Sequence, residues 1–285
     1  MAVQAGTLRQ TLGVPGRIVN RGIDGLASIG DQISFMFKSL ADTIVAIRHG
    51  GEVARLVSEI TLGAGALIVG AGTAGVIFFM AFFTGTQVGL EGFKGLQLIG
   101  AEAFTGFVSA FANTREITPL IAGVTLAAQV GAGFTAELGA MRVNEEIDAL
   151  EVMAVRPIPY LVSTRIIAAL TAIIPLYLIS LFSSYLATSL VVTKFLGLSG
   201  GTYNHYFSLF LPPTDVLYSL IKATVFAIAV ALIHCYYGFN ASGGPAGVGV
   251  AVGKAIRASI VAVNVLNLMM SAFMWGVHDT VRIAG

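Results

Sequence analysis

Five long stretches of this sequence contain no Asp, Glu, Lys or Arg. About 20 apolar residues cross the hydrocarbon core of a bilayer, so each stretch is close to or above the length of a membrane span. Charged residues make up 11% of the chain, whereas ordinary soluble domains carry about 25%. We therefore predict an all-α membrane protein with about five transmembrane helices. The stretches are Ile60–Leu90, Ile117–Ala136, Ile166–Thr193, Ala223–Val252 and Ile260–Val277.

The segments around these stretches give a domain outline. Residues 1–30 lack the compact apolar core of a signal peptide, and we expect them to stay in the cytoplasm. Residues 31–58 mix apolar and charged side chains, a pattern typical of an amphipathic helix in the membrane interface. The spans follow from residue 59 to 278, and residues 279–285 form a C-terminal tail.

Three segments between the spans are not expected to cross the membrane fully. Residues 96–113 contain Glu102 and end in a polar stretch, so we expect a short segment at or just within the far side of the membrane. Residues 200–206 are polar and aromatic, and residues 240–253 are small and rich in glycine. Both compositions indicate loops.

The distribution of basic residues predicts the orientation. Five crossings place the two termini on opposite sides, and cytoplasmic segments carry an excess of Lys and Arg. With the N terminus inside, eleven basic residues lie in inner segments and four in outer ones. The sequence therefore predicts an inner-membrane protein with a cytoplasmic N terminus and an outer C terminus. A net charge of +1 without basic clusters argues against nucleic acid as a partner.

Two glycine-rich motifs resemble nucleotide-binding loops but lack their context. Gly70, Gly72 and Gly75 match the spacing of a dinucleotide fingerprint, yet an uncharged apolar run follows them, which favours close helix packing. Residues 247–254 resemble a phosphate loop, but Val248 replaces the first required glycine and Ala255 the magnesium-binding hydroxyl. No metal or catalytic spacing is visible among the four histidines. We expect no cofactor in this chain and no enzymatic activity of its own.

Charged residues close to or inside the spans are candidates for a transport pathway. Such charges are costly in hydrocarbon and usually face a cavity or a partner. Glu102, Arg115, Glu116 and Lys222 are in such positions. A position at the membrane–water interface would equally explain why Arg115 and Glu116 are charged. A side chain that extends from the helix end to water explains Lys222 equally well.

The most charged stretch of the chain indicates a water-facing helix between two spans. Its acidic residues alternate with Ile147, Leu150 and Met153, which predicts one apolar and one charged face. The alternatives are a solvated loop helix and a docking helix whose acids meet a basic groove on a partner. The candidate docking residues are Arg142, Glu145, Glu146, Asp148, Leu150, Glu151 and Met153.

The same region carries a family resemblance. The chain resembles the MlaE/YrbE permeases from about residue 30 to 278, and residues 59–278 correspond to the permease domain. Within that family the B-type YrbE permeases of actinobacterial Mce systems are most similar. The resemblance rests on residues 115–119, 135–142, 145–157, 220–226 and 272–276, and for the B type on 234–238 with 243–245.

The resemblance implies a complex and a role for several residues. The expected partners are an A-type YrbE permease chain, a cytoplasmic ATPase dimer, Mce proteins and membrane lipids, with ATP and magnesium bound in the ATPase. The family's coupling helix corresponds to 145–153, and its charged residues near the lipid cavity correspond to Arg115, Glu116 and Lys222. Gln129-Val130 stands where Mla members place an arginine, so a cavity role of that position is not implied.

The expected function is transport of hydrophobic lipids between the inner membrane and an Mce tube. Fatty acids, mycolic-type lipids, phospholipids and sterols are the lipid classes that the resemblance implies. Two alternatives remain open from the residues alone. One is a secondary transporter driven by an ion gradient, with Glu102 or Glu137 as the coupling acid; the other is a membrane scaffold for envelope proteins that transports nothing.

Overall fold

The computed structural model describes residues 30–46, 49–62 and 72–276, and the regular structure in those ranges is helical. Five helices in this part of the chain are long and apolar enough to cross a membrane. The prediction of an all-α membrane protein with about five spans is therefore confirmed. The spans are α6 (Gly72–Gln97), a composite helix Glu102–Val143, a composite helix Ile158–Phe195, α13 (Pro213–Phe239) and α14 (Gly244–Trp275).

Both composite helices alternate between α-helical and wider π-helical geometry. π-Helical turns inside α-helices are rare and are frequently found at functional sites. The second span consists of η2 (Glu102–Phe104, a 3₁₀ turn), α7 (Thr105–Val108), the π-helix η3 (Ser109–Ile117), α8 (Thr118–Leu126), the π-helix η4 (Ala127–Gly131) and α9 (Ala132–Val143). The third consists of the π-helix η5 (Ile158–Ser163), α11 (Thr164–Leu190) and the π-helix η6 (Val191–Phe195).

The structure corrects three expected segments. Residues 102–113 belong to the long second span, because the polar residues that suggested a break are buried against other helices. Residues 200–206 form most of the helix α12 (Gly200–Leu209), in which Tyr203 is buried. The glycine-rich stretch after Asn240 is helical from Gly244 onward, with Pro245 in the first turn, where its missing N–H costs nothing.

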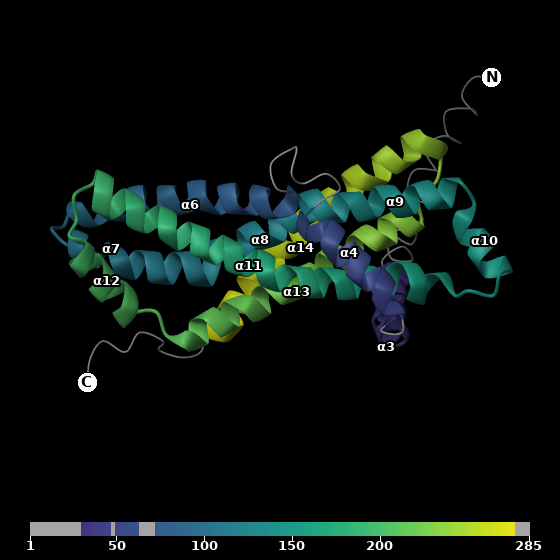
Figure 1. The fold of residues 1–285 in the computed structure, drawn as a ribbon, viewed down its shortest axis with the longest axis horizontal. Coiled ribbons are helices and arrows are strands. Elements are labelled where there is room, and N and C mark those ends of the chain that lie inside the picture. Colours follow the sequence, from purple (N-terminus) through teal and green to yellow (C-terminus); the bar gives the residue numbers. More distant parts are fainter. Residues whose placement is uncertain (1–29, 47–48, 63–71, 277–285) are drawn as a thin grey trace, which may run out of the picture.

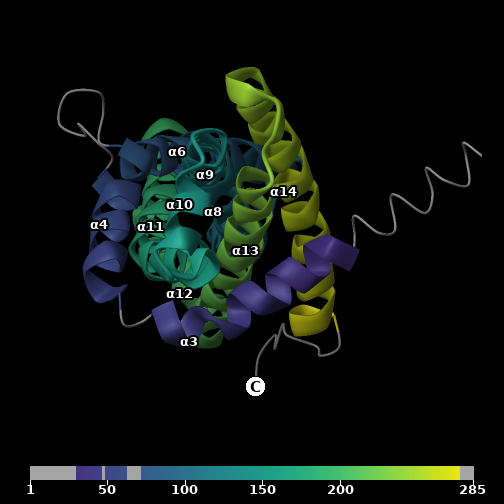
Figure 2. The same ribbon diagram turned by 90° about the vertical axis from the view of Figure 1, so that its right-hand side faces the viewer.

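The spans form an elongated bundle (Figure 1). α6 and α11 run in parallel and pack against each other, and α13 packs against α9, α11 and α14. Viewed along the bundle, α14 lies on one flank and α4 (Gly50–Leu62) on the opposite flank (Figure 2). The short helix α10 (Glu146–Val152) projects from one end, called here the α10 end, and α12 lies at the other, the α12 end.

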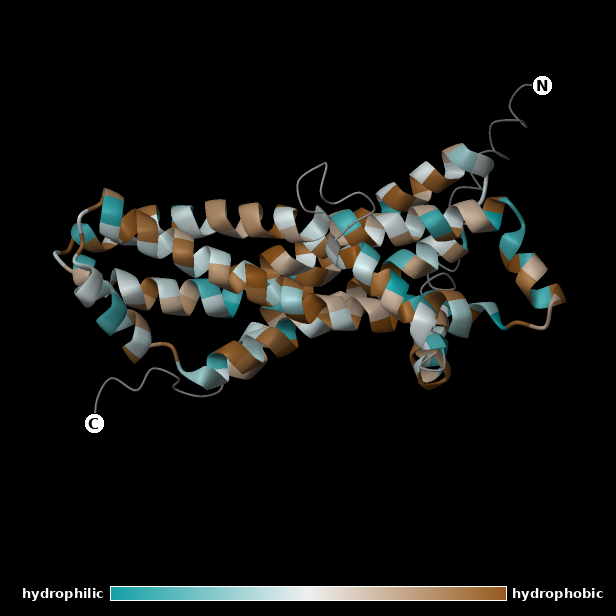
Figure 3. Cartoon of the chain, in the orientation of Figure 1, coloured by the Kyte–Doolittle hydropathy of each residue, from teal (hydrophilic) through white to brown (hydrophobic). Residues whose placement is uncertain are grey.

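The outer surface of α14 is apolar and uncovered within the described chain. Val261, Val265, Leu268, Met269 and Phe273 are each more than half exposed. Figure 3 shows apolar residues along the bundle, with more hydrophilic ones toward its two ends. A membrane protein places such a face against lipid or against another membrane helix.

The N-terminal part of the described chain packs against the α10 end. Residues 30–41 are helical, and Phe35 contacts the rings of Tyr236 and Phe239 at the end of α13. Within α4, Arg55 donates a hydrogen bond to the carboxylate of Glu52. This bond is the main reason that the pKa of Glu52 lies below its ordinary value. A position of these helices in the membrane interface stays a prediction.

The contact between α6 and α11 depends on a glycine, and this gives a first testable prediction. A Cβ atom at Gly85 would lie 2.4 Å from the backbone oxygen of Ser184, so Gly85→Ala must push the two helices apart. We expect a loss of about 1–3 kcal/mol in stability. The matched control is Gly95→Ala in the same helix, where nothing lies within 4 Å of the added atom. Thermal unfolding in detergent compares the two, and equal midpoints would contradict the close contact.

Candidate functional site: a buried charge cluster

A buried ion pair joins the second and fourth spans. Arg115 in η3 donates from Nε to Oδ2 of Asp215 at the start of α13 over 2.7 Å, and both side chains are about 95% buried (5% and 6% exposed). Trp275 at the end of α14 donates from its indole Nε1 to the other carboxylate oxygen over 3.0 Å. The arginine's guanidinium also lies over the ring of Phe111, 4.2 Å from its centroid. Three spans are thereby joined through one carboxylate.

Lys222 forms the second half of the cluster. Its side chain is fully buried, and Nζ donates to the carbonyl of Arg115 (2.7 Å), to Ser271 Oγ (2.6 Å) and to Glu116 Oε2 (3.1 Å). All three protons of the ammonium group therefore have an acceptor. Lys222 does not extend to water, which excludes the alternative explanation of this residue.

Glu116 is the exposed member of the cluster. Asn267 donates to its Oε2 over 2.9 Å, and Ser271 Oγ lies 2.6 Å from its Oε1. Even with these partners and Lys222, 40% of the glutamate side chain remains exposed. The charge cluster is defined here as Arg115, Glu116, Asp215 and Lys222 with their partners Asn267, Ser271 and Trp275.

Arg115 and Glu116 of the cluster lie in the π-helix η3. The N–H of Thr118 donates to the carbonyl of Asn113, five residues earlier, and the widened turn buries Asn113, Thr114 and Arg115 in succession. Three polar groups of this segment are therefore buried in succession, while the next residue, Glu116, stays half exposed.

A network of hydroxyl groups continues from the cluster into the bundle. Ser219 donates to the carbonyl of Thr114, and Tyr177 donates to Ser219 over 2.7 Å. Thr114 also shares a short hydrogen bond with Tyr185. These bonds hold η3, α11 and α13 in one register, because buried polar groups are costly when they are unpaired.

The structure groups three of the four predicted pathway residues and separates the fourth. Arg115, Glu116 and Lys222 are in contact, but Glu102 lies thirteen residues earlier on the same helix, which is roughly 20 Å away. Sequence reasoning missed Asp215. A signal was present, since Asp215 is the only acidic residue between Glu151 and Asp279.

The predicted docking helix exists and projects from the bundle. Glu145 precedes α10 with a φ of 62°, and Ala154 follows it with a φ of 59°, so the chain turns sharply at both ends. Ile147 is buried, Leu150 is half-buried, and Arg142 pairs with Asp148 over 2.6 Å. Glu145, Glu146, Asp148 and Glu151 are exposed.

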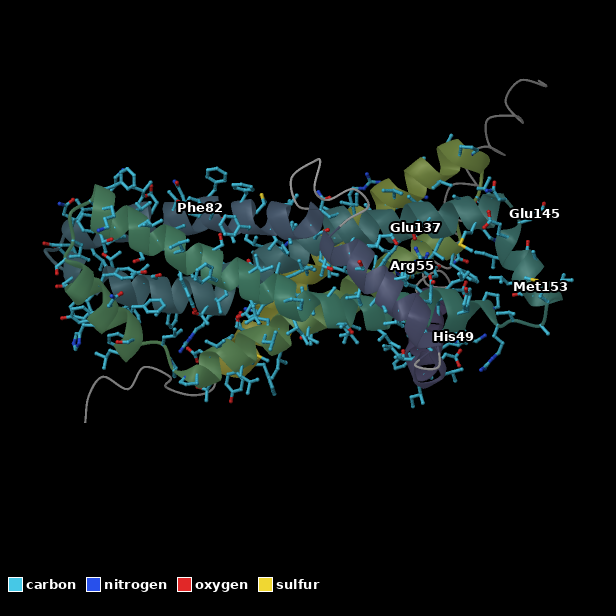
Figure 4. All side chains as sticks on the ribbon, in the orientation of Figure 1. His49, Arg55, Phe82, Glu137, Glu145 and Met153 are labelled. Atoms are coloured by element: carbon cyan, nitrogen blue, oxygen red, sulfur yellow. The ribbon has the colours of Figure 1, made fainter. Side chains whose placement is uncertain are left out.

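Met153 departs from the predicted apolar face. It is 65% exposed beside Val152, which is 89% exposed, because the helix ends at Val152 and Met153 no longer follows the helical spacing. Figure 4 shows Glu145 and Met153 at the two ends of this projecting segment. The tip therefore offers an apolar pair as well as acids.

The charge cluster places the half-exposed carboxylate of Glu116 beside the buried ammonium group of Lys222. Its two cations and two anions balance, and within the described residues no group of three His, Cys, Asp or Glu side chains could hold a metal ion. A half-exposed carboxylate beside a buried ammonium can bind a polar group that arrives from a membrane environment.

Comparisons with known proteins show the family to which the chain belongs. The family model "Permease MlaE" matches residues 63–273. A probable ABC transporter permease protein of Rickettsia prowazekii is 33% identical over 74% of this chain and 82% of its own length. One of Synechocystis is 30% identical over 75% and 81%. The chloroplastic protein TRIGALACTOSYLDIACYLGLYCEROL 1 of Arabidopsis thaliana is 30% identical over 73% of this chain and 60% of its own length. The chain belongs to the MlaE family of ABC transporter permeases.

Proposed function

We propose that this chain is the permease subunit of an ATP-driven, Mce-type lipid transporter. It moves hydrophobic lipids, namely fatty acids, mycolic-type lipids, phospholipids or sterols, between the inner membrane and a tube of Mce proteins. The observation that carries the proposal is the charge cluster, in which the Glu116 carboxylate is half exposed beside the buried Lys222 ammonium. The name of the Arabidopsis relative refers to a galactolipid, which also supports a lipid as the cargo.

The proposed assembly pairs this chain with an A-type YrbE permease on a cytoplasmic ATPase dimer. The uncovered apolar face of α14 is suited to line a cavity between two permease chains together with the first span. The α10 end faces the cytoplasm in the proposed orientation, with the N terminus inside and the C terminus outside. ATP binding in the partner then moves α10, and the cavity opens or closes.

The geometry gives less support to an ion-driven secondary transporter. Glu137, one candidate coupling acid, already accepts a bond from Arg165 over 2.8 Å. Glu102, the other, lies at the α12 end of its helix. A coupling acid must take up and release protons. An ion pair with an arginine favours the deprotonated carboxylate and therefore opposes this cycle.

The test is ATP-dependent lipid transfer by the complex reconstituted in liposomes. We expect Lys222→Met to lower lipid-stimulated ATPase activity and transfer about tenfold, the factor that 1.4 kcal/mol of lost interaction represents. Glu116 keeps Asn267 and Ser271 as partners, so the variant should fold.

The control is Lys94→Met, which removes an exposed lysine from the end of α6. Equal transfer by the two variants would contradict a role of the cluster in the lipid pathway. Uptake by the chain alone without ATP would favour a secondary transporter instead.

A further inference from the structure

The two cations of the charge cluster are engaged inside the chain. Arg115 is paired with Asp215, and both side chains are about 95% buried (5% and 6% exposed). Lys222 is fully buried, and each of its three ammonium protons has an acceptor. An anionic group that arrives from the membrane therefore meets neither the guanidinium nor the ammonium group. These cations hold the helices together and do not face a ligand.

The hydrogen-bonding capacity that the cluster leaves unused consists of acceptors. Each oxygen of a carboxylate accepts about two hydrogen bonds. Within the described residues, Oε2 of Glu116 accepts from Lys222 and Asn267, whereas Oε1 accepts from Ser271 and keeps one position open. Oδ1 of Asn267 is a second acceptor, and it is buried without a partner in that part of the chain. Since the Glu116 side chain is 40% exposed, a ligand can approach this carboxylate, and it must bring a donor.

The charge balance of the cluster favours a donor that carries no charge of its own. Arg115 and Lys222 balance Asp215 and Glu116. An added anion would lie beside the Glu116 carboxylate, and an added ammonium group would bring a third positive charge. An uncompensated charge is costly among membrane helices. A hydroxyl group can donate to Glu116 without disturbing this balance.

We infer that the charge cluster binds the uncharged hydroxyl group of a lipid, which donates to Oε1 of Glu116. This inference rests on the proposed function, because it names the head of the cargo at the same site. Among the lipids proposed above, it favours molecules with a free hydroxyl. It disfavours fatty acids and phospholipids, whose carboxylate and phosphate are negative. Glu116 then determines specificity, and Lys222 and Asn267 position its carboxylate.

The test compares lipids that share the oleyl chain and differ in the head. Oleyl alcohol, oleyl methyl ether, oleylamine and oleyl sulfate present a neutral donor, a neutral acceptor, a cation and a permanent anion. The purified complex is incubated with equal amounts of all of them, and mass spectrometry of the extracted lipids measures which are retained. We expect the alcohol to exceed the ether at least about tenfold, because a hydrogen bond to a charged group contributes at least this factor. The amine and the sulfate should also be retained less than the alcohol.

A variant tests the carboxylate itself. Glu116→Gln keeps the shape of the side chain but replaces one acceptor oxygen by an N–H donor, so the preference for the alcohol over the sulfate should fall at least about tenfold. The matched control is Glu91→Gln, which removes an exposed carboxylate from α6 and should keep the preference. Thermal unfolding compares the stability of the two variants. The ratios of the unmodified chain need no variant, so a folding defect in Glu116→Gln leaves the inference open to test.

Several results would overturn the inference. They are equal retention of the ether and the alcohol, preferred retention of the amine or the sulfate, and an unchanged preference in Glu116→Gln. Retention is measured without ATP, so its failure is distinct from failure of the proposed function. If the unmodified chain prefers the sulfate while Lys222→Met still loses lipid transfer, the cluster remains part of the lipid pathway and the hydroxyl assignment is wrong.

Discussion

Replacing Asp215 by alanine is expected to destabilise the folded protein by about 3–5 kcal/mol. The substitution leaves the guanidinium of Arg115 buried without its carboxylate, and breaking one partner of a buried ion pair has a cost of this size. It also removes the acceptor of the Trp275 indole N–H, so α14 loses one of its hydrogen bonds to α13, while that between Lys222 and Ser271 remains. For a chain of this size the shift in unfolding midpoint should be about 10 °C.

A double variant distinguishes the stranded charge from a general packing defect. Arg115→Met with Asp215→Leu removes both charges and should recover most of the lost stability, since an apolar pair of similar volume is often as stable as a buried ion pair. Asp148→Ala is the matched control, because it breaks an Arg–Asp pair of similar length that is exposed to water. That change should cost less than about 1 kcal/mol. Similar losses for Asp215→Ala and Asp148→Ala would contradict the burial of the first pair.

The spans could be predicted from the sequence because hydrocarbon excludes charge over a fixed length. The charge-free stretch Ile166–Thr193 lies inside the third helix, and most of the stretch Ile260–Val277 lies in the second half of α14. The same rule failed at Asn113, Thr114 and Arg115, which suggested a break in the helix. Their partners Thr188, Tyr185 and Asp215 lie 71 to 100 residues away in the chain, so no local pattern could show that these polar groups are satisfied.

The start of α14 was missed for a related reason. Its glycine-rich composition is typical of a loop, but Gly247 lies where a Cβ atom would meet the carbonyl oxygen of Ser242 at 1.8 Å. Glycine at this position allows two backbone segments to lie very close together, and it does not indicate a flexible loop. The candidate site was partly predictable, because Arg115, Glu116 and Lys222 are costly in a membrane wherever they lie. The sequence does not single out Asn267 and Ser271, because their partner Glu116 is far from them in the chain and only the fold brings them together.

The exposed tip of α10 should determine whether the permease retains its ATPase partner. Val152 and Met153 are 89% and 65% exposed at the end of a helix that the buried Ile147 anchors to the bundle. Burying an apolar side chain of this size contributes about 1.5–3 kcal/mol. Val152→Asp with Met153→Asp should therefore weaken binding of the ATPase subunit at least about a hundredfold. Co-purification and surface-immobilised binding measure the loss.

The opposite end of the bundle offers a matched control for this change. Leu98 and Ile99 are also adjacent and exposed, at 89% and 76%, but they follow α6 at the α12 end. Leu98→Asp with Ile99→Asp adds the same charge and should leave ATPase binding intact. The acids have a separate role: Glu146→Lys with Glu151→Lys should lower lipid-stimulated ATPase activity without affecting membrane insertion. If the Leu98 and Ile99 pair releases the ATPase and the Val152 and Met153 pair does not, the proposed orientation is reversed and α10 is not the coupling helix.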